Sequence, residues 1–242
     1  MSVDAEKKDA PENEVARSPY TIVFELEGAA LAGRQAEYDT LGSLLKTDKK
    51  NGLTPSLFIR HCLNRSPAAY LPGLLDALGA KQNSTKSLIE EIEAGIAMFL
   101  ASPDTGVNAA VASLLSAGQA RDIPAVALTA AKESAARGVL DQLGEPFASA
   151  SMYRPDPVPP VFPRSDTWLK LLKSIKRTPA ACVAIVGSQV AAKSALAAGL
   201  RCIAIPDQFT AFQDFSGVSA VIDADTEWDA AELLELVVPT DV

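Results

Sequence analysis

Five short runs of β-branched, aromatic and other apolar residues recur along the chain, and they constrain the fold more than any other feature. Each run has the length and composition of a buried strand. Helical patterns, in which apolar residues recur every three or four positions, lie between them. Strands that alternate with helices predict a parallel α/β sheet covered by helices on both faces. The predicted strands are residues 20–24, 124–129, 181–186, 202–205 and 218–222.

The helical patterns between these runs predict the layers that cover the sheet. Two of them are alanine-rich and end at Gly144 and Gly199, residues that terminate helices well. The other two keep leucine, valine or tryptophan on one helical face. The predicted helices lie around 107–118, 131–143, 165–175 and 189–198.

The stretch 36–102 breaks this alternation, because it contains helical patterns and no convincing strand. We therefore expect a Rossmann-like core formed by residues 19–35 and 103–242, with an α-helical cap domain at 36–102 inserted after the first strand. A helical excursion packed directly on the core is the alternative, and the sequence does not separate the two.

Local signals inside the insert predict where its helices begin. Ser66 and Pro67 form a suitable N-cap and first helical residue, and Pro72 is expected to split the helix that they start. Ser87 and Glu90 form a capping box ahead of an apolar stripe.

The composition limits the classes of function. The chain has 22 Lys and Arg against 30 Asp and Glu, a net charge of −8, which disfavours non-specific binding to nucleic acid. No apolar run approaches the length of a membrane span, so we expect no membrane partner. Residues 1–18 are charged and lack the apolar region of a signal peptide, so we expect a disordered tail. Three unclustered cysteines fit a reducing, cytoplasmic location.

Candidate functional residues follow the predicted strands. In an open parallel sheet, ligands bind beyond the carboxyl ends of the strands. The first strand is followed there by Glu25, Glu27 and Gly28, the second by Thr129, the third by Gly187 and Ser188, and the fourth by Asp207.

These positions carry a resemblance to a known family. TIVFELEGAAL, a helical insert, IPAVALTAA and VAIVGSQVAAKSALAAGL together resemble the haloacid dehalogenase-like superfamily, of the type with a helical cap. The resemblance runs from about Tyr20 to Val238. It implies a Rossmann-like core and Mg²⁺-dependent phosphatase or phosphomutase chemistry on a small phosphorylated molecule.

The resemblance also implies roles for individual residues. Glu25 stands at the position of the nucleophile and Glu27 at that of the acid/base, and both with Ser188 stand where Mg²⁺ would be held. The remaining matches would contact the substrate, and they are Gly28, Thr129 with the adjacent Ala130, and Arg164, the cation nearest to the expected lysine position.

The departures from the family pattern lie at the residues that do the chemistry. Both motif aspartates are glutamates, whose carboxylates lie about 1 Å further out, a displacement that can cost about 10²-fold in rate. Ser188 replaces the leading aspartate of the fourth motif, and no carboxylate follows until Asp207. The sequence therefore predicts that Mg²⁺ binding is doubtful and that hydrolytic activity is weak or lost.

Two alternatives remain open at this point. The first is a non-catalytic module that binds a small molecule or a protein in the same cleft. The second is a nucleotide-binding protein, because residues 187–194 differ from a P-loop only by Ala192 in place of its second glycine. His61 and Cys62 are adjacent, so on a helix they point about 100° apart and form no catalytic pair. The oligomeric state is not predicted.

Overall fold

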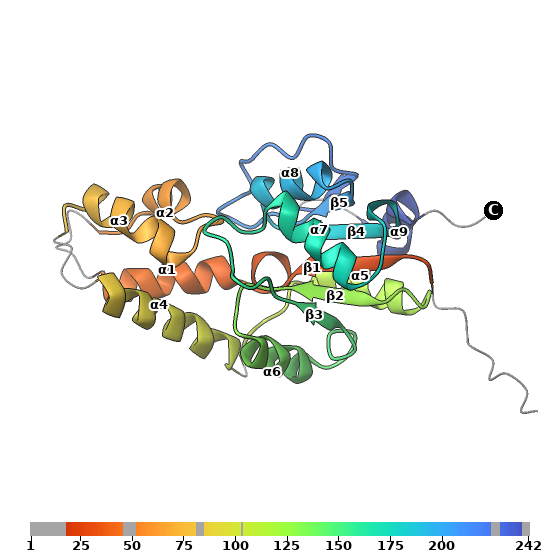
Figure 1. Ribbon diagram of the computed structural model, residues 1–242, viewed down its shortest axis with the longest axis horizontal. Helices are drawn as coiled ribbons and strands as arrows, with labels where there is room; N and C mark the ends of the chain where they lie inside the picture. Colours follow the sequence, from red (N-terminus) through yellow and green to blue (C-terminus); the bar gives the residue numbers. More distant parts are fainter. Residues whose placement is uncertain (1–17, 46–51, 81–84, 103, 224–227, 239–242) are drawn as a thin grey trace, which may run out of the picture.

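The computed structural model describes residues 18–45, 52–80, 85–102, 104–223 and 228–238. The predicted disordered tail, apart from Ser18, lies outside the described residues. Figure 1 shows an elongated molecule with a sheet and its covering helices at one end and a group of helices at the other.

One parallel sheet forms the centre of the molecule, with strand order β3-β2-β1-β4-β5-β6. β1 is central, because Glu25 pairs in register with Leu128 on one side and Phe24 with Ile185 on the other. The predicted α/β class is therefore confirmed, and each of the five predicted strands is present. The strands are β1 (Thr21–Glu25), β2 (Ala125–Leu128), β3 (Ser151–Tyr153), β4 (Cys182–Val186), β5 (Arg201–Ala204) and β6 (Ala220–Val221).

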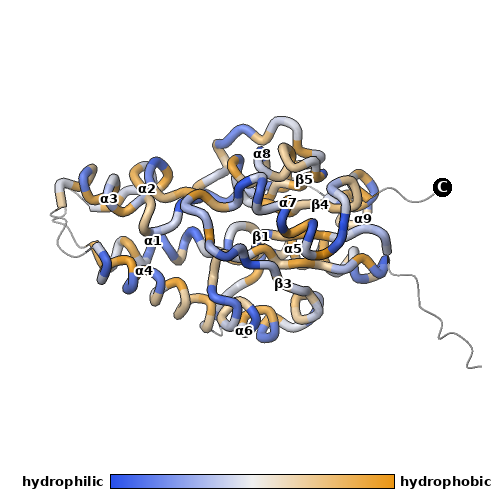
Figure 2. Tube along the Cα trace, in the orientation of Figure 1, coloured by the Kyte–Doolittle hydropathy of each residue, from blue (hydrophilic) through white to orange (hydrophobic). Residues whose placement is uncertain are grey.

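The two faces of the sheet pack against different helices. Ile22 and Phe24 point to one face and Val23 to the other, because side chains alternate along a strand. The first face is covered by α5 (Ala109–Gln119), α6 (Glu133–Leu143) and α9 (Ala230–Val237). The second is covered by α7 (Ser165–Ser174) and α8 (Gln189–Ala197), and the short turn η2 (Pro179–Ala181) lies between α7 and β4. Figure 2 shows the apolar colour concentrated in β4 and β5. Within the described residues, no helix combines the length and apolarity that crossing a membrane requires.

Four helices between β1 and β2 have a hydrophobic cluster of their own. Its buried members include Leu41, Phe58, Leu74 and Ile92, one from each helix. Along α4, Figure 2 shows the two colours alternating, as expected for a helix with one buried face. The helices are α1 (Gly33–Leu44), α2 (Pro55–His61), α3 (Pro67–Ala77) and α4 (Thr85–Leu100).

Two local predictions for this insert are wrong. Pro72 does not split its segment, because α3 runs unbroken through it. The burial of Tyr70, Leu71, Leu74 and Leu75 on either side of the proline outweighs the backbone hydrogen bond that proline cannot donate. Ser87 is not an N-cap either, since α4 already begins at Thr85 and the Ser87 hydroxyl donates to Glu91.

The insert is attached to the core by two segments that are distant in sequence. Phe209, from the loop after β5, packs its ring 5.0 Å from that of Phe58 and 5.5 Å from that of Tyr38. The proline-rich stretch 154–164 runs past the insert, where Ser66 N–H donates to the Pro160 carbonyl at 2.9 Å. Phe162 N–H donates to the Asn64 carbonyl, also at 2.9 Å. These contacts fix the position of the insert above the carboxyl edge of the sheet.

Candidate functional site

The candidate site lies where the chain reverses its direction of travel across the sheet, between the carboxyl ends of β1 and β4. Chain order runs outward from β1 to β3 and then returns to β4 on the other side of β1. Crevices for ligands form at such points in open parallel sheets. β1 ends at Glu25 and continues into the π-helical turn η1 (Leu26–Ala30), while Gly187 directly follows β4.

Glu25 is buried, with 4% of its surface exposed, and its carboxylate is bound to the protein backbone. Oε2 accepts a hydrogen bond from Gly187 N–H at 2.8 Å, which ties the end of β1 to the loop after β4. Burial raises the pKa of Glu25 to about 7, although the positive charge of Arg34 and the bond from Gly187 act in the opposite direction. Near neutral pH, much of the Glu25 population therefore keeps its proton.

Glu27 faces the other neighbour of β1. Its Oε1 accepts from the Thr129 hydroxyl and from Ala131 N–H, the latter at 3.1 Å. Burial raises the pKa of Glu27 as well, against the effect of the bond from Thr129. A spacing of two would place both carboxylates on one side of a strand, but Glu27 lies in η1. The two carboxylates therefore bind to loops on opposite sides of β1.

The backbones of Gly28 and Gly187 approach each other so closely that no residue with a Cβ would fit at position 187. A Cβ built on Gly187 would lie 1.7 Å from the Gly28 carbonyl oxygen. This approach brings the loop after β1 against the loop after β4, and it explains why glycine stands at position 187.

The other predicted site residues have local structural partners. Ser188 is buried and is the N-cap of α8, where its hydroxyl oxygen accepts from Ala191 N–H at 3.3 Å. Arg164 precedes α7, and its Nε pairs with Asp166 at 3.4 Å on the surface. Ala130 lies between Thr129 and Ala131, beside the Glu27 carboxylate.

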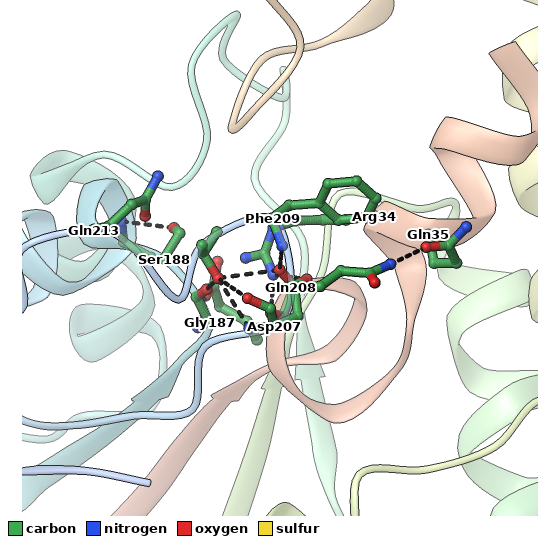
Figure 3. A network of polar contacts seen from close by, with 12 residues as sticks. Arg34, Gln35, Gly187, Ser188, Asp207, Gln208, Phe209 and Gln213 are labelled. Carbon is green, nitrogen blue, oxygen red and sulfur yellow. Dashed lines mark hydrogen bonds and ion pairs between the residues drawn. The ribbon is translucent and has the colours of Figure 1, made fainter. Parts of the chain in front are cut away.

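Arg34 joins the site although the sequence did not identify it as a functional residue, and it pairs with Asp207, which follows the fourth predicted strand. Nη1 of Arg34 donates to Asp207 Oδ2 at 2.7 Å and to the Gly28 carbonyl at 2.8 Å, as part of the network in Figure 3. The Arg34 side chain is 10% exposed. These two residues are 173 positions apart, so a single sequence holds no signal that pairs them.

Thr210 connects the same network to the loop after β4. Its hydroxyl lies 2.8 Å from the Gly187 carbonyl and 3.1 Å from Asp207 Oδ1, and its oxygen accepts from Asp207 N–H at 2.9 Å. The loops after β1, β4 and β5 are thus joined by one continuous set of hydrogen bonds, part of which Figure 3 shows.

The donor set does not fit Mg²⁺. This ion prefers an octahedron of hard oxygen ligands that includes one or two carboxylates. In the described part of the chain, no group of three or more His, Cys, Asp or Glu side chains could hold a metal ion. The Glu25 and Glu27 carboxylates diverge, Ser188 caps a helix, and the Arg34 guanidinium lies beside Asp207.

A cavity of about 550 Å³ opens beside this network. Its lining comes from the loops after β1 and β5 and from the segment that enters α5. The polar side chains are Gln35, Asn108, Asp207 and Gln208, and Gln208 also donates to Gln35, as Figure 3 shows. Apolar walls complete it, and they are formed by Ala29, Leu31, Ala32, Val107, Ile205 and Phe209.

Comparison with solved structures gives many similar folds at low sequence identity. CbbY from Rhodobacter sphaeroides, solved in complex with phosphate, superposes with a TM-score of 0.69 at 18% identity, covering 90% of this chain and 98% of its own. A predicted phosphoglycolate phosphatase from Haemophilus somnus gives 0.70 at 14% identity, with 90% and 98% coverage. A HAD family hydrolase from Deinococcus radiodurans, with bound phosphate and sodium, gives 0.65 at 18% identity, with 92% and 100% coverage. No protein-family model and no curated protein sequence matches this chain.

Proposed function

From the haloacid dehalogenase-like fold that this chain has, we propose that it is a non-catalytic protein that binds a small molecule in the cleft between its sheet and its helical insert. The predicted family resemblance agrees with this fold. What the chain does with the fold depends on the state of its site residues.

One observation carries the proposal: the groups that would attack, protonate or hold a phosphoryl group are bonded to one another. The Glu25 carboxylate binds Gly187 N–H, and the Thr129 hydroxyl donates to Glu27. An in-line attack needs a free, ionised nucleophile held at the correct distance from phosphorus. A carboxyl group with a pKa of about 7 and one oxygen bound to the backbone meets this need poorly.

The same reasoning makes a nucleotide the weaker candidate. A phosphate cradle requires free backbone N–H groups at a helix N-terminus. In residues 187–191, Gly187 N–H donates to Glu25, Gln189 N–H to Gln213 at 2.8 Å, and Ala191 N–H to Ser188. These three N–H groups already donate to oxygen atoms of the protein and are therefore not free to bind a phosphate.

The cavity of about 550 Å³ is the proposed ligand site, and its size is typical of small-molecule pockets. Neutral amide side chains line it together with apolar residues, and its one acidic side chain, Asp207, already pairs with Arg34. A neutral molecule with both hydrogen-bonding and apolar parts matches this lining.

A phosphorylated ligand is the second candidate, and a smaller cavity favours it. About 190 Å³ of space lies between Thr129, Glu133, Tyr153 and Arg154, and Arg154 is exposed there. CbbY has also been solved with phosphate and with xylulose-(1,5)bisphosphate. Binding at this position would leave the 550 Å³ cavity empty, so the two candidates are distinguishable.

The catalytic part of the proposal is tested by hydrolysis of p-nitrophenyl phosphate in millimolar Mg²⁺. We expect wild type and Glu25→Ala to give the same rate as the buffer alone, because the motif residues are already paired. A wild-type rate well above the buffer that Glu25→Ala abolishes would contradict the proposal.

The binding part is tested by blocking the cavity. Gly106 lines it, and a Cβ at this position meets no atom within 4 Å. We expect Gly106→Trp to unfold at the wild-type temperature but to lose the small-molecule hits that a fragment screen by NMR finds for wild type. Gly138→Trp is the matched control, because Gly138 has the same free space but lies on α6 away from the cavity lining. Hits that survive Gly106→Trp would place the ligand elsewhere.

A further inference from the structure

Arg34 places a positive charge where the loops after β1, β4 and β5 meet. It is the fourth residue after the five-residue turn η1, which begins where β1 ends, and its side chain returns toward that strand end. Nη1 lies near both of the close glycines, bonded to the Gly28 carbonyl and 3.0 Å from a Cβ built on Gly187. The guanidinium is thus inside the loop cluster at the carboxyl edge, with little contact with water.

Three carboxyl groups experience its positive charge. Asp207 forms the direct ion pair at 2.7 Å. Burial raises the pKa values of Glu25 and Glu37, and the charge of Arg34 lowers both, so Arg34 offsets part of the cost of burying these groups. An arginine stays charged at all relevant pH values, which suits a permanent internal cation.

We propose that the Arg34 guanidinium is the resident cation of this site and does structurally what a divalent metal ion would do, holding Asp207 and the loop after β1 together. This inference rests on the proposed function, because a site that holds its own positive charge needs no metal ion and has none to use in hydrolysis. It predicts that divalent cations do not change the thermal stability of the wild-type protein.

Removal of the guanidinium would leave several oxygen atoms around the volume that it now fills, and oxygen is the ligand that Mg²⁺ and Ca²⁺ prefer. Asp207 Oδ2 and the Gly28 carbonyl both lose their Arg34 partner, and the Glu25 carboxylate lies against Gly28, with Oε1 3.0 Å from a Cβ built there. The Asp207 carboxylate and the Gly28 carbonyl are ligands that Ca²⁺ and Mg²⁺ accept, and a cation bound between them would favour the ionised form of Glu25. Arg34→Ala therefore converts a metal-independent site into one that a divalent cation restores.

The test is thermal unfolding of the full chain in EDTA and in millimolar Mg²⁺, Ca²⁺ or Mn²⁺. We expect Arg34→Ala to have a lower Tm than wild type in EDTA. A cation at about ten times its dissociation constant should then raise the Tm of the variant by about 3–6 °C. The Tm of wild type should be the same in both buffers.

Two arginine controls separate loss of the cation from loss of an arginine. Arg34→Lys keeps a positive charge, so its Tm should not respond to the metals. Arg137→Ala removes another arginine that bonds to backbone carbonyls, those of Ala148 and Ala150 at 3.0 and 2.9 Å, from a position on α6 that has no bond to the loops after β1, β4 or β5 among the described residues. It should lower the Tm and remain indifferent to metal.

A folded Arg34→Ala whose Tm does not change with any of the three metals overturns the inference. If Arg34→Ala does not fold in either buffer, Arg34→Ala with Asp207→Asn decides, because it also removes the carboxylate that lost its partner. Recovery of folding supports the role of Arg34 as a counter-ion, and failure to recover overturns it. Hydrolysis by wild type, measured separately, would contradict the proposed function alone.

Discussion

Glu37 shows that burial, rather than motif position, sets the charge state of a carboxyl group in this chain. It lies on α1 within the insert, where its Oε1 accepts from the Tyr70 hydroxyl at 2.8 Å. Burial raises its pKa to about 7, against the opposing effects of that bond and of Arg34. Since the raised pKa belongs to the folded state, the folded protein holds this proton to higher pH than the unfolded chain does.

Glu37 therefore makes the free energy of unfolding depend on pH. Its contribution is fully present below about pH 4.5 and is lost as the pH rises toward 7, at up to about 1.4 kcal/mol per pH unit. Glu37→Gln still accepts from Tyr70 but does not titrate, so we expect the variant to be more stable relative to wild type at pH 8 than at pH 5. Urea unfolding at the two pH values measures this difference.

The control for this substitution is Glu90→Gln, which removes the same charge from an exposed position on α4. It should leave the difference between the two pH values unchanged. An equal effect of Glu37→Gln and Glu90→Gln would show that net charge, and not burial, produces the pH dependence.

At the same scale, the sequence predicted the positions of Glu25, Glu27 and Thr129 but not their partners. Position follows from local pattern, because each residue directly follows a strand. The pairing of Arg34 with Asp207 depends instead on how distant loops meet, which no local pattern contains.

The strands that the sequence predicted are those with a local pattern, and the strand and turn that it missed lack such a pattern. β1, β2, β4 and β5 were predicted because each is a run of apolar residues that is buried on both faces. β3 was missed because Ser151–Tyr153 is three residues long, with Ser151 exposed. The turn η1 was also missed, and it is the reason why the predicted pair of carboxylates faces two directions.

The helix α3 offers a test of how tertiary packing overrides a helix breaker. Pro72 cannot donate to the carbonyl of Ala68, and a proline inside a helix costs about 3 kcal/mol relative to alanine. We expect Pro72→Ala to raise the free energy of unfolding by about 1–3 kcal/mol, as measured by urea denaturation. Pro67→Ala is the control at the first helical position, where no hydrogen bond is lost, and it should change stability by less. A loss of stability in Pro72→Ala would show that the proline fits its site better than alanine does.

For the molecule as a whole, one aromatic ring, that of Phe209, is among the contacts that join the insert to the core. Phe209 belongs to the loop after β5 but is 3% exposed within the cluster of the insert. Phe209→Ala should cost about 3–5 kcal/mol, because it leaves a cavity beside Phe58 and Tyr38. Urea unfolding gives the cost, and faster hydrogen exchange in α2 would locate it.

Phe212 provides the matched control, since it lies three residues further along the same loop and is 65% exposed. Phe212→Ala should change stability by no more than about 0.5 kcal/mol. Similar losses for the two variants would mean that the loop, and not the buried ring, joins the insert to the core.

The division into a core and a cap at 36–102 stays a prediction, although the insert has a cluster of its own. α1 begins at Gly33, three residues before the predicted boundary, and Arg34 on its first turn belongs to the site of the core. A sequence pattern locates the helices, but it does not show that the first of them serves both parts.

The place of the insert between β1 and β2 has a consequence for how the chain folds. Ile22 must find Ala125, and Thr21 must find Cys182, so the central strand makes its first contacts across long stretches of unfolded chain. Of the described buried residues in the insert's cluster, Phe209 alone comes from outside residues 33–100, so the helices can collapse on one another early from nearby parts of the chain. A collapsed insert shortens the loop that separates the two strands and lowers the entropy lost when they pair. During folding, early collapse of the insert should therefore favour the pairing of β1 with β2.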